Sequence, residues 1–343
     1  MQSFKIGNKE IGVNSPMLII AEIASAHEGR FKDMLKLVDF AIETGADAIK
    51  FQVMNQASHI TPSHSIYDLV GQLEFNEEQW INIVSYTRSN SNLVIMTDVY
   101  DIVSIEIVKK MNPDIVKIHS ADLNNKQLVR EVAWLKKPSM IGVGASSLEE
   151  IRKAIHWFKD ENDSSFLSIM DGYQGFPTKI VDMNINQISL LQDLFGIPVG
   201  FLDHTEGDSE ESIFLSIAAR SLGAFAVEKH IVLDRGMKGI DYQSALSMPF
   251  FKKFISQIRT LESALGEKTP KSFSPGEQRY RDFMKKDIVA CEFIRKGDKF
   301  THNNITLKRS NGGLSQKYFD LILDRMAKVN ITKNEIITFK KIS

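Results

Sequence analysis

Two histidines at the ends of short apolar runs could bind one metal ion together. His204 ends the run "VGFLDH" and His230 ends "AFAVEKH". Imidazole nitrogens are common ligands of divalent metals, and a carboxylate such as Glu22, near the end of "MLIIAEI", could join them or hold a water molecule. Alternatively, each imidazole only hydrogen-bonds a loop carbonyl. The residues alone leave both interpretations open.

Two lysines lie within apolar runs, where an unpaired ammonium group is costly. Lys50 stands in "DAIKFQV" and Lys117 in "DIVKIHSAD". Either each lysine meets a carboxylate, or both face an anionic ligand. The hydroxyls of Thr97 and Ser120, at neighbouring run ends, are donors that a phosphate or carboxylate accepts, which favours an anion site. A Schiff base at one lysine, as in aldolases, stays open as an alternative.

The elements that position these residues are eight apolar runs separated by helical patterns. The runs cover residues 17–23, 47–53, 93–98, 114–122, 139–144, 166–172, 199–204 and 224–230. Helix start signals occur at Asn76 to Gln79 and at Ser147 to Glu150. Eight strand-helix units over about 250 residues predict an α/β fold, a closed (β/α)8 TIM barrel. The rival, an open doubly wound sheet, usually has a Gly-x-Gly-x-x-Gly turn after its first strand, and "AEIASAHEG" is no such turn.

A barrel places its functional residues where strands end, at one rim. Besides the residues above, this rule selects Phe51, Gln52, Asp98, Asp122, Asp171, Asp203, Glu228 and Lys229. A polar ring at one end of an apolar barrel is therefore expected.

The chain changes character after residue 266. We predict a catalytic barrel over residues 1–266, a polar linker rich in Pro, Gly and Ser over 267–283, and a small, mainly β module over 284–343. The β-type runs of that module are "DIVACEFI", "NITLKR" and "EIITFKK". The module is too small to form an active site by itself, and its size suits it to cover an active site.

Composition excludes several classes of protein. The 343 residues have a net charge of −1, which gives no reason to expect a nucleic-acid or membrane partner. A single cysteine, Cys291, excludes an internal disulfide framework. The N-terminal segment does not read as a signal peptide, and no run is long enough to span a membrane. We expect a cytoplasmic protein.

Several motifs, taken in chain order, resemble those of the sialic acid (N-acetylneuraminate) synthase family. They are "IAEIASAHEG", "GADAIKFQ", "VKIHSAD", "SSLEEI", "GFLDHTEG", "VEKHIVLDRGMKGIDYQSAL" and "FIRKGDKFTHNNITLKRSNGG". The family joins a (β/α)8 barrel to a C-terminal antifreeze-like (SAF) domain. The resemblance implies condensation of phosphoenolpyruvate with an open-chain N-acyl hexosamine, giving a nonulosonic 2-keto acid and phosphate.

The resemblance also implies roles for individual residues. A divalent metal, Mn²⁺ or Mg²⁺, would be held by His204 and His230, with Glu22 beside the reacting carbons. Phosphoenolpyruvate would be bound by Lys50, Thr97, Lys117 and Ser120. The sugar would be bound by Gln52, Asp122, Gln174, Phe176, Asp241 and Arg309. In the family the arginine reaches across a domain-swapped dimer, which implies a homodimer.

The chain departs from the family pattern at several positions. Asp122 replaces a glutamate, Gly142 and Leu202 replace serines that bind phosphate, and residues 174–177 replace a loop that usually reads like "SNYP". We expect a thinned phosphate site and a remodelled sugar pocket. Two alternatives to the synthase remain: a catalytically silent relative that binds a sugar in an assembly or regulatory role, and a pyruvate lyase.

Overall fold

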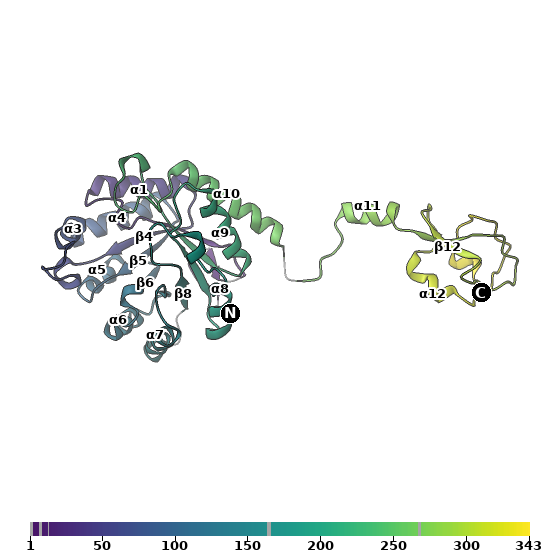
Figure 1. Cartoon of the computed structure of the whole chain (residues 1–343), viewed down its shortest axis with the longest axis horizontal. Coiled ribbons are helices and arrows are strands. Elements are labelled where there is room, and N and C mark those ends of the chain that lie inside the picture. Colours follow the sequence, from purple (N-terminus) through teal and green to yellow (C-terminus); the bar gives the residue numbers. More distant parts are fainter. Residues whose placement is uncertain (1–2, 7–8, 13, 163–165, 267–268) are drawn as a thin grey trace. The chain divides into compact units, whose positions relative to one another are not determined.

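Strand β3 pairs with β4 on one side and with β10 on the other, so eight parallel strands close a barrel. The computed structural model describes residues 3–6, 9–12, 14–162, 166–266 and 269–343 (Figure 1). The predicted TIM barrel is confirmed. Its strands are β3 (Leu18–Glu22), β4 (Ala48–Val53), β5 (Val94–Val99), β6 (Ile115–Ile118), β7 (Ser139–Gly142), β8 (Leu167–Asp171), β9 (Val199–Asp203) and β10 (Ala226–His230).

Alternate residues of each strand face the inside of the barrel or the surrounding helices. On β4, Phe51 packs outward against Trp80 of helix α4, with ring centroids 5.9 Å apart. Its neighbour Lys50 points inward to the barrel mouth. Both faces of the strands are buried, which is why the strands read as continuous apolar runs. This alternation decides which predicted residues reach the site.

Helices follow every barrel strand and cover its outer face (Figure 1). The capping boxes predicted at Asn76 and Ser147 are both present. The helices of this layer are α1 (Phe31–Thr44), α2 (Gln56–His59), α3 (Tyr67–Leu73), α4 (Glu77–Asn90), α5 (Ser104–Met111), α6 (Lys126–Trp134), α7 (Leu148–Glu161), α8 (Gln187–Phe195), α9 (Glu210–Ser221) and α10 (Met248–Leu265).

A hairpin that the sequence did not reveal closes the other end of the barrel. Strands β1 (Ser3–Ile6) and β2 (Lys9–Gly12) pair antiparallel. Phe4 stacks on Phe166 with ring centroids 4.2 Å apart, and Ile11 packs with the apolar side chains inside the barrel. Because this end is plugged, access to the interior lies at the opposite rim, where the strands end.

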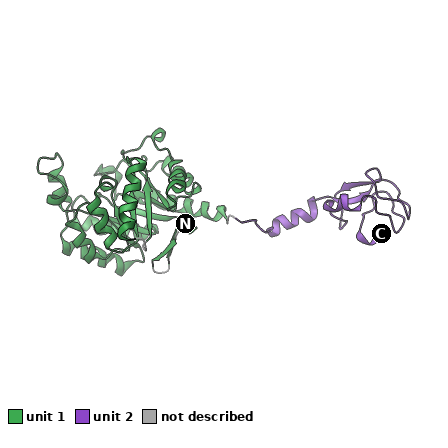
Figure 2. Cartoon of the chain, turned by 90° about the horizontal axis from the view of Figure 1, so that it is seen from below, with its two compact units in different colours: residues 1–266 green, residues 267–343 purple. Residues whose placement is uncertain are grey.

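The chain divides into two compact units, residues 1–266 and 267–343 (Figure 2). The segment expected to be a linker contains helix α11 (Pro275–Met284), which begins at a Ser274/Glu277 capping box. The second unit has its own apolar core, with the antiparallel strands β11 (Asp287–Ala290) and β12 (Ile305–Lys308) and the short helix α12 (Phe319–Ile322). The third predicted run is not a strand: Ile336 forms an isolated bridge with Val289, and a 3-10 turn follows.

Within the described residues, no helix is both long and apolar enough to cross a membrane.

Candidate active site in the barrel mouth

A cavity of about 230 Å³ opens at the C-terminal ends of the barrel strands. It brings together ten of the residues selected from the sequence: Lys50, Gln52, Asp98, Lys117, Gln174, Phe176, His204, Glu228, His230 and Asp241. The remaining lining residues are Ala24, Tyr100, His119 and Leu202.

The two buried lysines meet carboxylates inside the cavity. Lys50 Nζ lies 2.6 Å from Glu22 Oε2, 2.7 Å from Asp98 Oδ2 and 2.6 Å from Glu228 Oε1. Lys117 Nζ lies 3.2 Å from both the Asp98 and the Glu228 oxygens. The sequence suggested that each lysine either pairs with a carboxylate or faces an anionic ligand. The structure shows that the two are not exclusive, because both lysines pair with carboxylates and also line the cavity.

Opposing effects set the pKa values in this charge cluster of Glu22, Lys50, Asp98, Lys117 and Glu228. Burial lowers the pKa of Lys50, against the attraction of Asp98 and Glu228. Burial would also lower the pKa of Lys117, but the same two carboxylates outweigh it and raise that pKa. Burial would raise the pKa of Glu228, whereas the two lysines bring it below its usual range. Lys117 and Glu228 therefore remain ionised at neutral pH.

His204 and His230 lie side by side at the cavity wall, with ring centroids 5.3 Å apart. His204 Nδ1 lies 2.8 Å from the Tyr173 carbonyl oxygen and can donate to it, which leaves Nε2 as a lone-pair donor. His230 Nδ1 is buried and has no hydrogen-bond partner among the described residues. Burial lowers the pKa of both imidazoles, so both are neutral at pH 7. Phe176 packs against both rings, with centroid separations of 4.4 Å and 6.1 Å.

The donor set of these two histidines fits a divalent metal with two protein ligands. Neutral imidazoles are the form that binds metals, and the carbonyl partner of His204 fixes its ring in the way metal-ligating histidines are usually fixed. Across the described residues, no group of three or more His, Cys, Asp or Glu side chains is arranged to hold a metal ion. The other coordination positions would thus belong to substrate or water.

Glu22 is not among the residues that line the cavity. Its side chain is fully buried, and Oε1 accepts from the Ala24 backbone at 2.7 Å and from Gln52 Nε2 at 3.2 Å. Its other oxygen pairs with Lys50. Glu22 therefore contacts three residues that do line the cavity.

The structure does not place Thr97 in the site. On the neighbouring strands it is paired with Phe51 and Val116, whose side chains pack in the core between the barrel and the helices. The side chain of Thr97 therefore faces outward, toward the helices. The inward position belongs to Asp98. Adjacent residues on a strand face opposite sides, so Thr97 does not line the cavity in this geometry, and its predicted contact with phosphoenolpyruvate stays a prediction.

Three other predicted residues do not line the cavity. Ser120 and Asp122 belong to a 3-10 turn after β6, where Asp122 accepts from Asn125 Nδ2 at 3.2 Å. Burial raises the pKa of Asp122. Arg309 is an exposed residue of the second unit. Its predicted contact with the sugar stays a prediction.

Asp241 reaches the cavity on a loop held by one arginine. Arg235 Nη1 donates to the carbonyl oxygens of Tyr242, at 2.6 Å, and of Ala245, while Nη2 lies 3.0 Å from Glu206 Oε1. Burial raises the pKa of the Asp241 carboxyl group. The loop between β10 and α10 thus adds an acidic group to the cavity wall.

Tyr100 and His119 were not selected from the sequence as site residues. Their rings stack with centroids 5.0 Å apart. His119 Nδ1 accepts from the Ala121 backbone at 3.2 Å, so the imidazole carries its proton on Nε2, and burial lowers its pKa to about 4. A signal was present in the sequence: His119 stands two residues after Lys117 and Tyr100 two after Asp98, and residues two apart in an extended chain face the same side.

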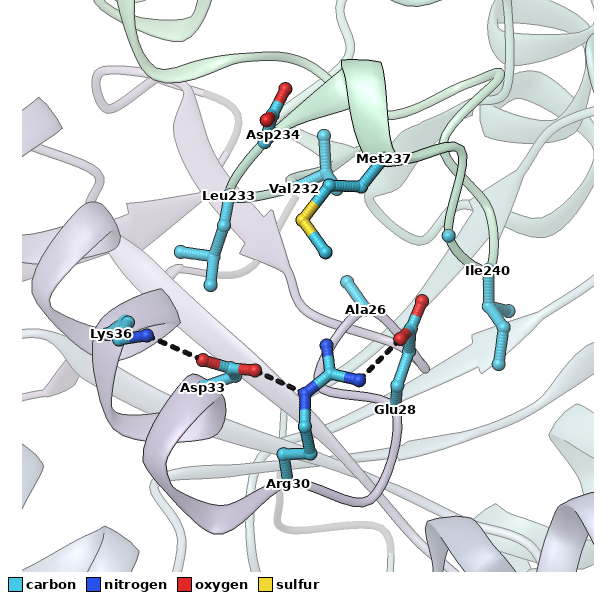
Figure 3. A pocket seen from close by; sticks show the side chains of 11 residues that line it. Ala26, Glu28, Arg30, Asp33, Lys36, Val232, Leu233, Asp234, Met237 and Ile240 are labelled. Atoms are coloured by element: carbon cyan, nitrogen blue, oxygen red, sulfur yellow. Dashed lines mark hydrogen bonds and ion pairs between the residues drawn. The ribbon is translucent and has the colours of Figure 1, made fainter.

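A second cavity, of about 360 Å³, lies at the rim between helix α1 and the loop after β10 (Figure 3). Its charged side chains pair with one another: Arg30 with Glu28 and Asp33, and Lys36 with Asp33. Leu233, Met237 and Ile240 form an apolar wall (Figure 3). Although larger, this cavity contains none of the residues selected as functional, and four of its five charged side chains, all except Asp234, pair with one another.

Comparison with known proteins identifies relatives of the whole chain. The model of the NeuB family matches residues 37–270, and that of the SAF domain matches residues 288–343. An uncharacterised protein of Methanocaldococcus jannaschii is 33% identical over 98% of both chains. The N,N'-diacetyllegionaminic acid synthase of Campylobacter jejuni is 28% identical, over 93% of this chain and 98% of that one.

A solved structure shows the same architecture. The crystal structure of N-acetylneuraminic acid (sialic acid) synthetase from Leptospira borgpetersenii, in complex with citrate, superposes with a TM-score of 0.75 at 26% identity. The match covers 82% of this chain and 97% of the other.

Proposed function

This chain belongs to the NeuB family and has a SAF domain, and from that premise we propose that it condenses phosphoenolpyruvate with an open-chain N-acyl hexosamine. The products would be a nonulosonic 2-keto acid and inorganic phosphate, so the enzyme would be a transferase. Relatives named for legionaminic and neuraminic acids support this class of product. The identity of the acceptor sugar is left open by those names.

The observation that best supports the proposal is one cavity lined by both buried lysines and both histidines. Lys50 and Lys117 would hold the anionic groups of phosphoenolpyruvate. His204 and His230 would hold a divalent metal, Mn²⁺ or Mg²⁺, which when bound would polarise the aldehyde oxygen of the sugar. Gln52 and Asp241, which also line the cavity, would bind sugar hydroxyls.

Phosphoenolpyruvate, the sugar aldehyde and water together account for every atom of the products. The C3 atom of phosphoenolpyruvate forms a bond to the aldehyde carbon, and the aldehyde oxygen takes up a proton. Water adds at C2, and the bond between C2 and the phosphate oxygen breaks to release phosphate and leave the ketone. The free oxygens of Asp98 and Glu228, which have no hydrogen-bond partner among the described residues, are available to orient that water or a substrate hydroxyl.

The geometry opposes the form of the pyruvate lyase alternative in which Lys117 bears the Schiff base. A Schiff base requires a neutral lysine amine. Lys117 lies between two carboxylates that raise its pKa, so its amine stays protonated at neutral pH.

We also propose a homodimer in which the SAF domain of one chain closes the barrel of the other. In that arrangement Arg309 would contact the sugar of the partner's site. The support is the resemblance of "LKRSNGG" to the family motif.

The experiment that tests the proposed function measures phosphate release. The protein is incubated with phosphoenolpyruvate, a divalent cation and a panel of aldoses from N-acetylmannosamine to diacetamido hexoses. Release that requires both the aldose and the cation is the expected result. If no aldose in the panel releases phosphate, the proposal fails.

A further inference from the structure

An ion pair on the outer face of the barrel joins the two strands that carry the cavity histidines. Lys229 Nζ on β10 lies 2.9 Å from Asp203 Oδ2 on β9, and both side chains are fully buried. The two residues are direct partners in the pairing of these strands. Each immediately precedes a histidine, His204 or His230. Because adjacent strand residues face opposite sides, the ion pair faces the helices while the histidines line the cavity.

The carboxylate of Asp203 also fixes the backbone around His204. Its Oδ1 accepts from Thr205 N at 3.0 Å and from Thr205 Oγ1 at 2.6 Å, which closes a turn with His204 at its centre. Its Oδ2 accepts from Ser216 Oγ of helix α9 at 2.9 Å. One buried carboxylate therefore connects the turn at His204 to the helix layer and, through Lys229, to strand β10.

The His230 ring depends on its strand more than the His204 ring does. His204 Nδ1 lies 2.8 Å from the Tyr173 carbonyl oxygen, whereas His230 Nδ1 is buried and has no hydrogen-bond partner among the described residues. The pairing of β10 with β9 runs from Val227 to Lys229, so the ion pair lies at its last step, one residue before His230. The distance between the two imidazoles is therefore set where Lys229 meets β9.

We propose that the Asp203–Lys229 ion pair positions the metal centre, because it holds His204 and His230 at the separation at which both imidazoles reach one divalent cation. Neither residue of the pair touches the cation, and both act through the histidines. The inference rests on the metal site of the proposed function. Residues that orient the ligands of a metal typically contribute about 10- to 100-fold to its affinity.

Replacing both residues separates positioning from the effect of an unpaired buried charge. Lys229→Met alone would leave the Asp203 carboxylate buried without its counter-charge, whereas Lys229→Met/Asp203→Asn removes both charges together. Calorimetry on the full-length double variant should show Mn²⁺ binding about 10- to 100-fold weaker than in wild type. Asp203→Asn is a second, milder variant, since a buried lysine without a partner can lose its proton, and it should weaken Mn²⁺ binding in the same way. Wild-type affinity in either variant overturns the inference, as does an absence of Mn²⁺ binding by wild type.

The matched control is Arg220→Met/Glu262→Gln, which removes another largely buried ion pair. Arg220 Nε lies 3.4 Å from Glu262 Oε1, and the side chains are 11% and 13% exposed. Arg220 also donates to the Ser15 carbonyl oxygen, which precedes β3 at the end of the barrel away from the histidines. The control should be less stable to urea and keep its Mn²⁺ affinity within about twofold of wild type. If it loses as much affinity as the Asp203–Lys229 variants, general destabilisation is the cause and the inference is wrong.

Recovery of activity by added metal gives a second readout. Phosphate release by Lys229→Met/Asp203→Asn should be low at limiting Mn²⁺ and rise as Mn²⁺ is increased, with the KM for phosphoenolpyruvate at saturating Mn²⁺ within about twofold of wild type. An Mn²⁺ requirement equal to that of wild type would contradict the inference. If Mn²⁺ binding depends on the ion pair but wild type turns over no aldose, the inference stands and the proposed function fails.

Discussion

Lys50 and Glu228, 178 residues apart in the sequence, lie inside the barrel with Nζ and Oε1 2.6 Å apart. Strands β4 and β10 are thereby joined through one ion pair, which Glu22, Asp98 and Lys117 extend. Three carboxylates and two ammonium groups give this cluster a net charge of −1 when all are ionised. A divalent cation on the neighbouring histidines would make the site attractive to an anionic substrate.

Replacing Lys50 by Met should destabilise the barrel and abolish activity. Three buried carboxylates would lose their shared partner, and breaking a buried pair costs roughly 3–5 kcal/mol. The double variant Lys50→Met/Glu228→Gln should recover part of the stability and none of the activity. Urea unfolding and phosphate release are the measurements. A double variant no more stable than the single one would show that carboxylate repulsion is not the cause.

Gly142→Ser, which restores the serine of the family motif, should lower kcat/KM for phosphoenolpyruvate at least about tenfold. The new Cβ would meet Ser120 and displace it together with Gln174. Gly276→Ser on α11 is a matched control, since the nearest atoms to its Cβ are 3.9 Å away. Unchanged or increased activity in Gly142→Ser would contradict this picture of the phosphate region.

His27 should make the protein lose stability in mild acid. Its ring is 3% exposed and packs on Phe75, and burial, helped by Arg30, lowers its pKa to about 4. Between pH 6.5 and pH 4 the unfolded chain takes up a proton that the folded protein excludes, so stability falls as the pH falls. From pH 7 to pH 5, wild type should lose up to about 2 kcal/mol more than His27→Gln.

The matched control for that experiment is His156→Gln, which changes an exposed histidine of α7. It should lose stability with pH as wild type does. Urea unfolding at both pH values provides the comparison, and identical pH slopes for wild type and His27→Gln would refute the assignment.

Arg309→Ala should raise the KM for the aldose by about tenfold or more and leave the KM for phosphoenolpyruvate within about twofold, as expected for loss of a charge-assisted hydrogen bond. Sedimentation should show a dimer for wild type and variant alike. A monomeric, fully active wild type would exclude the proposed domain swap.

The sequence was sufficient to predict the barrel and the convergence of the two histidines. Strands buried on both faces read as apolar runs, and a polar residue such as His204 or His230 at the end of a run marks the rim. Parallel strands of a closed barrel then bring such ends together.

The inward or outward direction of single residues could not be predicted from those same runs. A strand that is apolar on both faces shows no alternation, so both Thr97 and Asp98 were selected, and only Asp98 lines the cavity. Ion pairs between distant strands, such as Lys50 with Glu228, depend on register and closure of the barrel. The crowding of Ser120 against Gly142 is likewise visible only in three dimensions.

Phosphate release from phosphoenolpyruvate with an accepted aldose, measured before and after a chelator removes divalent cations, is the decisive test of a metal-dependent synthase. We expect release that stops on chelation, returns with Mn²⁺ or Mg²⁺, and is absent from His204→Ala under all conditions. Release that persists after chelation, or that His204→Ala retains, would contradict this expectation.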